Sequence, residues 1–301
     1  MGHYSISELE QLSGVKAHTI RIWEQRYGLL QPQRTSTNIR LYDDEALRHL
    51  LNVATLCGRG HRISKVAGMS PAERGRAVLD CYDDAHDHTA RVNALVAAMI
   101  GFDEPRLSEL LDEAAAGLGF EEALLYIAYP LLQRLGLSWQ AGSIIAAHEH
   151  LISHLLRQKI LAATNSLPPS VATGPGQGWV LFVPEGELHE LALLFINYAL
   201  RRRGQHTLYL GQNQPVEDLA TVCEIYQPHT LLGVLTARPA LAEVPALAAG
   251  LLAIRPGQQR LLLYGPLAQH VASRLPPGCV APARMTDFLA LIPNLKEAVG
   301  G

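Results

Sequence analysis

The sequence is poor in aromatic residues and in cysteines that could act together. Phe, Trp and Tyr make up 6% of the 301 residues, whereas hydrophobic residues make up 48%. The apolar share is mostly Leu and Ala, which suits closely packed helices. The cysteines form no Cys-x-x-Cys pair, so we expect reduced structural thiols, with a thiol sensor or a soft-metal site as the less favoured alternative. They are Cys57, Cys81, Cys223 and Cys279.

Long apolar runs and a basic, then apolar, leader are also lacking. We therefore expect no transmembrane helix and no signal peptide, and we expect the protein in the cytoplasm. The net charge of −3 hides an asymmetry: residues 1–80 hold 11 Lys and Arg against 8 Asp and Glu, and the remainder holds 14 against 20. This distribution indicates that the first segment meets a polyanion.

The first segment, residues 1–75, has the pattern of a helix-turn-helix. Apolar residues recur at helical spacing over 6–12, Gly14 breaks that helix, and a second helix is expected over about 17–25. The polar stretch 31–38 reads as a loop or wing. Asp43 or Asp44 then caps a helix rich in leucine. We expect a fragment of residues 1–75 to fold on its own.

The middle segment, residues 76–165, reads almost wholly as helix. Four apolar periodic stretches with glycines at their breaks predict an up-and-down four-helix bundle. The stretches are 92–100, 107–118, 123–135 and 144–161. Residues 166–178 follow as a linker rich in Pro, Gly and Ser.

The last segment, residues 179–301, alternates short apolar runs with helical stretches. Such alternation predicts a doubly wound α/β domain, Rossmann-like or flavodoxin-like, with its ligand at the carboxyl ends of the strands. The expected strands are 179–183, 207–210, 230–235 and 260–264. The predicted fold class is therefore multi-domain: a winged helix-turn-helix, a helical bundle and an α/β domain.

Four pieces of the first segment agree in order and spacing with one family. They are Gly14-Val15, Thr19-Ile20-Arg21-Ile22-Trp23-Glu24, Gly28-Leu29-Leu30 and Arg40-Leu41-Tyr42. Together they resemble the winged-helix DNA-binding domain of MerR-family transcription regulators. Asn38 stands where the family usually has a wing glycine, and Asn tolerates the left-handed conformation better than most residues.

Basic and polar side chains of this segment are the candidate DNA contacts. Thr19 and Arg21 lie on the exposed face of the second helix and can reach the major groove. Arg34 and Arg40 bracket the wing and would meet phosphates. The resemblance implies that Tyr42 also contacts the DNA backbone. We assign Ile20 and Trp23 to the small core, where large apolar residues usually lie.

In a second motif, nine residues separate Trp139 from Glu149-His150. It resembles the Trp-x9-Glu-His motif of the CarH and LitR photoreceptors. The resemblance implies that these residues lie over the upper face of adenosylcobalamin, around its adenosyl group. Trp139 precedes the helix that carries Glu149 and His150, so one face could present all three. Gln140 stands where some relatives have a histidine.

A third motif, Glu187-x-His189, follows the first strand of the α/β segment. It resembles the Asp-x-His-x-x-Gly motif of cobalamin-binding domains of the methionine synthase type. The resemblance implies that His189 ligates cobalt as the axial base, and that Glu187 fixes the histidine tautomer in place of the aspartate.

The α/β segment departs from that family at three places. Ala192 replaces the glycine of the motif, residues 235–237 keep little of a Ser-x-Leu region, and Tyr264-Gly265 stands where the family has Gly-Gly. A tyrosine could crowd the nucleotide tail of cobalamin, because only glycine allows such close approach. Three alternatives follow: cobalamin held in a modified way, another tetrapyrrole, or no ligand.

The expected protein is a homo-oligomeric transcription repressor, a dimer or tetramer, that binds operator DNA. Its DNA affinity would be controlled by a ligand between bundle and α/β domain, with adenosylcobalamin as light-sensing chromophore. We expect no enzymatic activity. The alternatives are a regulator that acts without ligand through protein contacts and, less favoured, a corrinoid-dependent methyl carrier.

Overall fold

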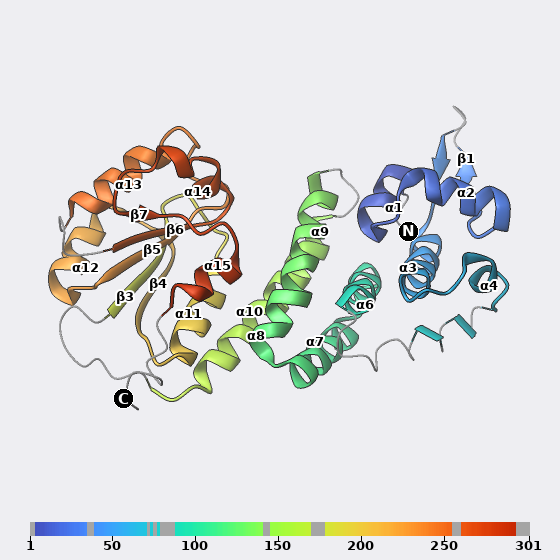
Figure 1. Ribbon diagram of the computed structural model, residues 1–301, viewed down its shortest axis with the longest axis horizontal. Coiled ribbons are helices and arrows are strands. Elements are labelled where there is room, and N and C mark those ends of the chain that lie inside the picture. Colours follow the sequence, from blue (N-terminus) through green and yellow to red (C-terminus); the bar gives the residue numbers. More distant parts are fainter. Residues whose placement is uncertain are drawn as a thin grey trace. The chain divides into compact units, whose positions relative to one another are not determined.

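The protein forms two compact units, Met1–Leu156 and Arg157–Gly301. Both are drawn in Figure 1, coloured along the sequence. The computed structural model describes residues 4–34, 39–70, 73–74, 77–78, 88–140 (without the side chains of 136–140), 145–169, 178–254 and 260–292.

The first unit begins with the predicted helix-turn-helix. Ser5 caps α1 (Ile6–Ser13) in a capping box with Glu8, as the first turn of a helix needs side-chain acceptors. Gly14 ends α1 at φ 74°, a left-handed conformation that glycine adopts without strain. Helix α2 (Ala17–Tyr27) follows directly. The short turn therefore fixes the angle between the two helices.

A small β-ribbon forms the wing. Strand β1 (Gln33–Arg34) pairs antiparallel with β2 (Arg40–Leu41), and an isolated bridge joins Tyr4 to Tyr42. The predicted position of Asn38 lies outside the described residues. Asp43 caps α3 (Asp44–Gly58) by accepting a hydrogen bond from the N–H of Ala46 at 2.8 Å, and a short α4 (Ile63–Ala67) follows.

Four helical runs make up the described part of the bundle, as predicted. The third run is longer than predicted and contains a π-helical turn, η2. The runs are α6 (His88–Ile100), α7 (Glu104–Leu118), α8–η2–α9 (Phe120–Ala123, Leu124–Ala128, Tyr129–Gln140) and α10 (Ala146–Asn165). Helix α6 packs against α3, and α9 packs against α1. The winged helix, α6 to α9 and the start of α10 share the first unit, so this division does not separate residues 1–75 from their neighbours.

The second unit is a doubly wound α/β fold. Its described residues form a five-stranded parallel sheet in the order β4-β3-β5-β6-β7. The four predicted strands are present, and β7 was not predicted. The strands are β3 (Gly178–Pro184), β4 (His206–Gln214), β5 (Thr230–Val234), β6 (Arg260–Tyr264) and β7 (Cys279–Val280). This order brings the ends of β3 and β5 together, although about 50 residues separate them in the chain.

Helices cover both faces of this sheet (Figure 1). One face packs Val180, Phe182 and Leu263 under α12, α13 and α14. The other carries Trp179, whose ring meets Phe288 of α15 edge-on, and α11 packs against it. The helices are α11 (Leu191–Arg202), α12 (Asp218–Tyr226), α13 (Val244–Ala253), α14 (Pro266–His270), the 3-10 turn η3 (Ala272–Arg274) and α15 (Met285–Ala290).

Three of the four cysteines lie in the described part of the chain. Cys57, Cys223 and Cys279 form no disulfide in the described part of the chain, and Cys81 lies outside it. The described residues contain no group of three or more His, Cys, Asp or Glu that could hold a metal ion. No helix found in the same ranges is long and apolar enough to cross a membrane.

Candidate functional site

Helix α2 presents polar side chains at its start. Ile20 is fully buried, as predicted, while Arg21 is exposed and Thr19 is half-buried. Trp23 is half-buried rather than fully in the core. Thr19 and Arg21 lie in the first turns after the Gly14 turn, and in helix-turn-helix proteins this part of the second helix enters the major groove. The exposure of Arg21 suits the predicted base contact.

Glu24 ties α2 to the wing. Arg40 Nε donates to Glu24 Oε1 at 3.0 Å, and the Tyr42 hydroxyl donates to Glu24 Oε2 at 2.7 Å. The hydrogen bond and charge of Glu24 raise the pKa of Arg40, and burial, together with Glu24, raises the pKa of Tyr42. Tyr42 is 1% exposed, so its hydroxyl serves this contact. A DNA contact by Tyr42, which stays a prediction, requires that bond to open.

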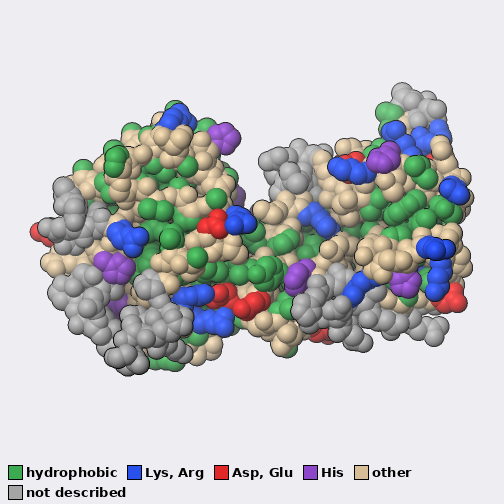
Figure 2. All heavy atoms as spheres, viewed as in Figure 1, with side chains coloured by type: hydrophobic (Ala, Val, Ile, Leu, Met, Phe, Trp, Pro, Cys, Tyr) green, Lys and Arg blue, Asp and Glu red, His purple; other side chains and the backbone are tan. Residues whose placement is uncertain are grey.

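Exposed basic side chains lie on the winged helix. Arg34 is exposed on β1, in the position predicted for a phosphate contact. Figure 2 shows Lys and Arg side chains, in blue, over α2 and the wing. Clustered positive charge of this kind attracts the phosphate backbone without reading sequence.

The bundle carries the second predicted motif on two different helices. Trp139 lies near the end of α9, where its side chain, like that of Gln140, is outside the described atoms. Glu149 and His150 lie in the first turns of α10, with side chains 41% and 66% exposed. Glu149 Oε1 accepts from the Ser153 hydroxyl at 2.5 Å. The side chains of Glu149 and His150 are therefore accessible to a ligand.

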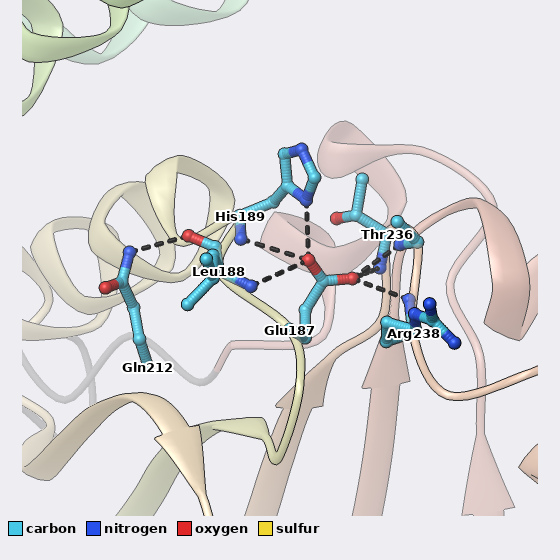
Figure 3. A network of polar contacts seen from close by, with 7 residues as sticks. Glu187, Leu188, His189, Gln212, Thr236 and Arg238 are labelled. Atoms are coloured by element: carbon cyan, nitrogen blue, oxygen red, sulfur yellow. Dashed lines mark hydrogen bonds and ion pairs between the residues drawn. The ribbon is translucent and has the colours of Figure 1, made fainter.

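Glu187 is the centre of a hydrogen-bond network in the loop after β3 (Figure 3). Its side chain is 1% exposed. Oε1 accepts from the N–H groups of Leu188 and His189 and from Nδ1 of His189, at 2.9, 3.0 and 2.5 Å. Oε2 accepts from the N–H groups of the loop after β5: Thr236 at 3.1 Å, Ala237 at 2.5 Å and Arg238 at 2.8 Å. The carboxylate thus joins the ends of two neighbouring strands.

These hydrogen bonds keep Glu187 ionised. Burial alone would raise the pKa of its carboxyl, but donors from Ala237, His189 and Arg238 outweigh that effect and lower the pKa to about 2. A carboxylate facing Nδ1 holds the proton there, which leaves Nε2 of His189 as the nitrogen that can bind a metal. The ring is 63% exposed and points away from the strand ends (Figure 3). The chemistry of the Glu187–His189 pair therefore fits a histidine that would hold the cobalt of a corrinoid through Nε2.

Tyr264-Gly265 has a role within the sheet. Tyr264 is 3% exposed at the end of β6. Gly265 has φ +114°, and a Cβ there would lie 2.4 Å from the carbonyl oxygen of Leu235. The glycine is thus required by the close approach of β5, and Tyr264 fills space on the face opposite the core of α12 and α13. Ala192 lies half-buried in the first turn of α11.

Further residues organise this edge of the sheet and were missed in the sequence. Asn213 Oδ1 accepts from the N–H of Gly186 at 2.8 Å, and Gln212 Nε2 donates to the carbonyl of Leu188 at 2.6 Å. Polar residues at the end of a predicted strand were the available signal for these two.

A second buried carboxylate lies next to His189. Glu190 accepts from Arg157 Nε of α10 at 2.5 Å and from the Tyr209 hydroxyl of β4 at 3.0 Å. The carboxylate is 8% exposed. The C-terminal half of α10 is thereby fixed to the loop that carries His189. Nothing in the sequence pattern identifies this triad, because its members are distant in the chain.

Two family descriptions match separate parts of the chain. Residues 4–73 match the MerR HTH family regulatory proteins, and residues 91–163 match the B12 binding domain. The first range covers the winged helix and the second covers most of the bundle.

Known proteins resemble the chain in fold and in sequence. The monomethylamine corrinoid protein of Methanosarcina barkeri, a solved structure, shares the fold with a TM-score of 0.54 at 17% identity, over 65% of this chain and 93% of that one. HTH-type transcriptional repressor CarA of Myxococcus xanthus is 29% identical over 74% of this chain and 73% of its own length.

HTH-type transcriptional repressor CarH of Myxococcus xanthus is 32% identical over 75% of this chain and 76% of its own length. This similarity continues past the winged helix and through the bundle, in agreement with the two family matches. The chain therefore belongs to the CarH family of MerR-type transcriptional repressors with a B12-binding domain.

Proposed function

We propose that this protein represses transcription by binding operator DNA, and that adenosylcobalamin sets its DNA affinity in response to light. The observation that carries the proposal is the Glu187–His189 pair, in which a buried carboxylate 2.5 Å from Nδ1 directs Nε2 outwards. A solvated loop histidine has no need of such a fixed tautomer, whereas an axial ligand does. Support also comes from the B12-binding match and the kinship with CarH.

The chain's residues would divide the work of holding the cofactor. His189 would hold the cobalt through Nε2, and Glu187 would fix the tautomer and ring orientation of His189. Trp139, Glu149 and His150 would shape the space around the adenosyl group. The cofactor, when bound, supplies a cobalt–carbon bond that light can cleave.

DNA binding would be the output. Thr19 and Arg21 would read bases, Arg34 and Arg40 would meet phosphates, and a homo-oligomer would bind paired half-sites. Ligand, assembly and DNA affinity would be linked by one coupling free energy, so any ligand that favours assembly also favours DNA binding. Residues 1–75, 76–165 and 179–301, with the linker 166–178, would be the corresponding modules.

We infer a regulator rather than a methyl carrier. The helix-turn-helix is complete, and the resemblance to a corrinoid protein at 17% identity concerns fold alone. Transfer of a methyl group from a bound methylcorrinoid to an added thiol acceptor, at a rate above that of free methylcorrinoid, would contradict this inference.

The proposal is tested by the colour of the protein and by its DNA binding. The full chain is purified in the dark with adenosylcobalamin supplied, and its absorption spectrum is recorded. A gel shift on DNA selected by the protein from a random library is then run in the dark and after green light. We expect bound corrinoid and loss of the shifted band on illumination. A colourless protein that still binds DNA would instead identify a regulator without cobalamin.

A further inference from the structure

A buried polar chain joins the winged helix to the bundle. Arg134 of α9 donates through Nη1 to Asn93 Oδ1 of α6 at 2.7 Å. Asn93 Nδ2 donates to Thr55 Oγ1 of α3 at 2.9 Å, and Thr55 Oγ1 donates to the carbonyl of Leu51 at 2.9 Å. Asn93 and Thr55 are 2% and 3% exposed. Two helices of the bundle and one of the DNA-binding segment are thus linked by two buried side chains, Asn93 and Thr55, and by the half-buried Arg134.

The same guanidinium reaches the helix-turn-helix itself. Arg134 Nη1 also donates to the carbonyl of Leu12 at 3.3 Å. Leu12 lies in the last turn of α1, where carbonyl groups lack partners within the helix and attract positive charge. The next residues are Ser13 and Gly14, the turn into α2. Arg134 therefore caps the helix whose end sets the direction of the recognition helix.

Partial burial makes the hydrogen bonds of Arg134 selective for one arrangement of the two segments. Desolvation lowers the pKa of Arg134, as expected for a cation withdrawn from water. A buried donor whose acceptor is removed loses its compensation for lost hydration, so alternative placements of the two segments are disfavoured. Apolar packing alone would allow sliding, whereas this chain of hydrogen bonds specifies one docked arrangement.

The first turn of α10 provides a second approach of the bundle to the DNA-binding segment. His148 is 8% exposed and stacks on Phe102, with ring centroids 4.3 Å apart. It lies close enough to Asp44, at the start of α3, to interact electrostatically. The helix that carries Glu149 and His150 therefore also approaches the DNA-binding segment.

We propose that Arg134 is a positioning residue for DNA binding. Through Leu12 and Asn93, it holds α1 and α3 against the bundle, so α2 moves with α9. Trp139 lies on the same helix, little more than one turn further on. A displacement of this end of α9 on cofactor binding is then carried to the recognition helix as a rigid movement. This proposal rests on the proposed function, since it concerns how cobalamin alters DNA affinity.

The test compares Arg134→Met with Arg106→Met in the full chain. Arg106 pairs with Glu109 and Glu113 on the surface of α7, so its variant removes an arginine of the bundle outside the chain of contacts. The DNA affinity of each protein is measured with and without adenosylcobalamin in the dark, and cobalamin affinity is measured by absorbance. We expect the ratio of the two DNA affinities to fall towards one in Arg134→Met alone, with cobalamin affinity unchanged within about threefold.

A second measurement does not depend on the cofactor. Spin labels on unnatural amino acids, which spare the cysteines, are placed at exposed Gln25 of α2 and Ala116 of α7. We expect a narrow distance distribution in wild type and in Arg106→Met, and a broad one in Arg134→Met. If Arg134→Met does not fold, Thr55→Val replaces it. This variant removes only the last side chain of the hydrogen-bonded series, the one on α3.

The outcomes separate the two proposals. A narrow distribution, or an unchanged affinity ratio, in a folded Arg134→Met protein would overturn the positioning role. If wild type shows no effect of cobalamin on DNA affinity, the proposed function fails, and the label distances still decide whether Arg134 fixes the docked arrangement.

Discussion

At the scale of single residues, His189 and Glu187 should contribute unequally to cobalamin binding. His189→Ala should weaken binding and change the visible spectrum, because it removes the ligand atom. Glu187→Ala should weaken it by about 10–100-fold, as is usual when the partner of a metal-bound histidine is removed. Absorbance titration in the dark measures both. His270→Ala, an exposed histidine of α14, is the matched control and should bind as wild type does.

The depressed pKa of Glu187 also predicts how stability depends on pH. A carboxyl whose pKa is about 2 in the folded protein and 4.5 in the unfolded chain stabilises the fold above pH 4.5 and loses this effect as pH falls towards 2. The shift corresponds to about 3 kcal/mol. Wild type should therefore exceed Glu187→Gln in free energy of unfolding at pH 7, with the difference shrinking below pH 4.5.

Urea unfolding at several pH values measures this difference. With Trp23 and Trp139 replaced by Phe, fluorescence reports only on Trp179, which is buried in β3. A difference that persists unchanged at about pH 3 would show that Glu187 does not carry the effect through its charge.

Residue identities predicted only the contact between Glu187 and the His189 ring in this network. The pair Glu187 and His189 was visible because its members are two positions apart. The donors Thr236, Ala237 and Arg238 were not visible as partners, because they contribute backbone N–H groups and lie about 50 residues later. Their proximity follows from the neighbouring places of β3 and β5 in the sheet, which no local pattern specifies.

At the scale of elements, α2 and the wing should differ in what their arginines do. Arg21→Ala should weaken binding to the selected DNA by about 1–3 kcal/mol, because a base contact is lost. Arg40→Ala should weaken binding to all sequences and lower the salt slope by about one, as expected for one phosphate contact. Gel shifts at several salt concentrations distinguish them. Arg274→Ala, exposed in η3, is the control, and wild-type affinity in the Arg21→Ala, Arg40→Ala double variant would refute the interface.

Substitution of Tyr264, the last residue of β6, should change the stability of the fold and the affinity for cobalamin in opposite directions. Tyr264→Gly should lower stability by about 3–5 kcal/mol, as for other large buried aromatic side chains that are truncated. The same change should tighten cobalamin binding if the nucleotide tail runs beside β6. Thermal unfolding and absorbance titration measure the two effects. Tyr264→Phe, which keeps the volume, should not tighten binding, and no binding by either Tyr264→Gly or wild type would mean that the site is vestigial.

Elements with strong periodicity were well predicted, and weak ones were not. Strand β6 matches its predicted bounds, because four buried apolar residues follow an exposed arginine. Strand β7 has two residues and no alternation, so no pattern could indicate it. The π-helical turn at η2 changes the hydrogen-bond spacing without changing which residues are apolar.

At the scale of the whole molecule, the winged helix should depend on the bundle for stability. A fragment of residues 1–75 loses the packing of α6 on α3 and of α9 on α1, and it exposes Thr55. We expect its α1–α3 region to exchange amide hydrogens faster than the same region of a 1–165 fragment. Equal exchange rates in the two fragments would show that residues 1–75 fold independently, as the sequence suggested.

Composition predicted three segments but could not show which of them dock. Near residue 178 the apolar pattern changes from helical periodicity to short apolar runs that alternate with helical stretches. At this point the structure changes from the helical bundle to the α/β fold. The contact between winged helix and bundle depends on single polar side chains such as Asn93 and Arg134, which look like ordinary helix residues in the sequence. Packing between two segments depends on how well their surfaces complement each other. Local patterns in the sequence do not indicate this complementarity.

The network around Glu187 also bears on how cofactor dependence could change during evolution. Its carboxylate accepts hydrogen bonds from five backbone N–H groups in addition to the imidazole of His189. Loss of the imidazole would leave this carboxylate solvated by the protein, so the sheet edge should survive a substitution at position 189. During evolution, a single substitution at position 189 could thus remove or restore the cobalt ligand while the fold of the protein is kept.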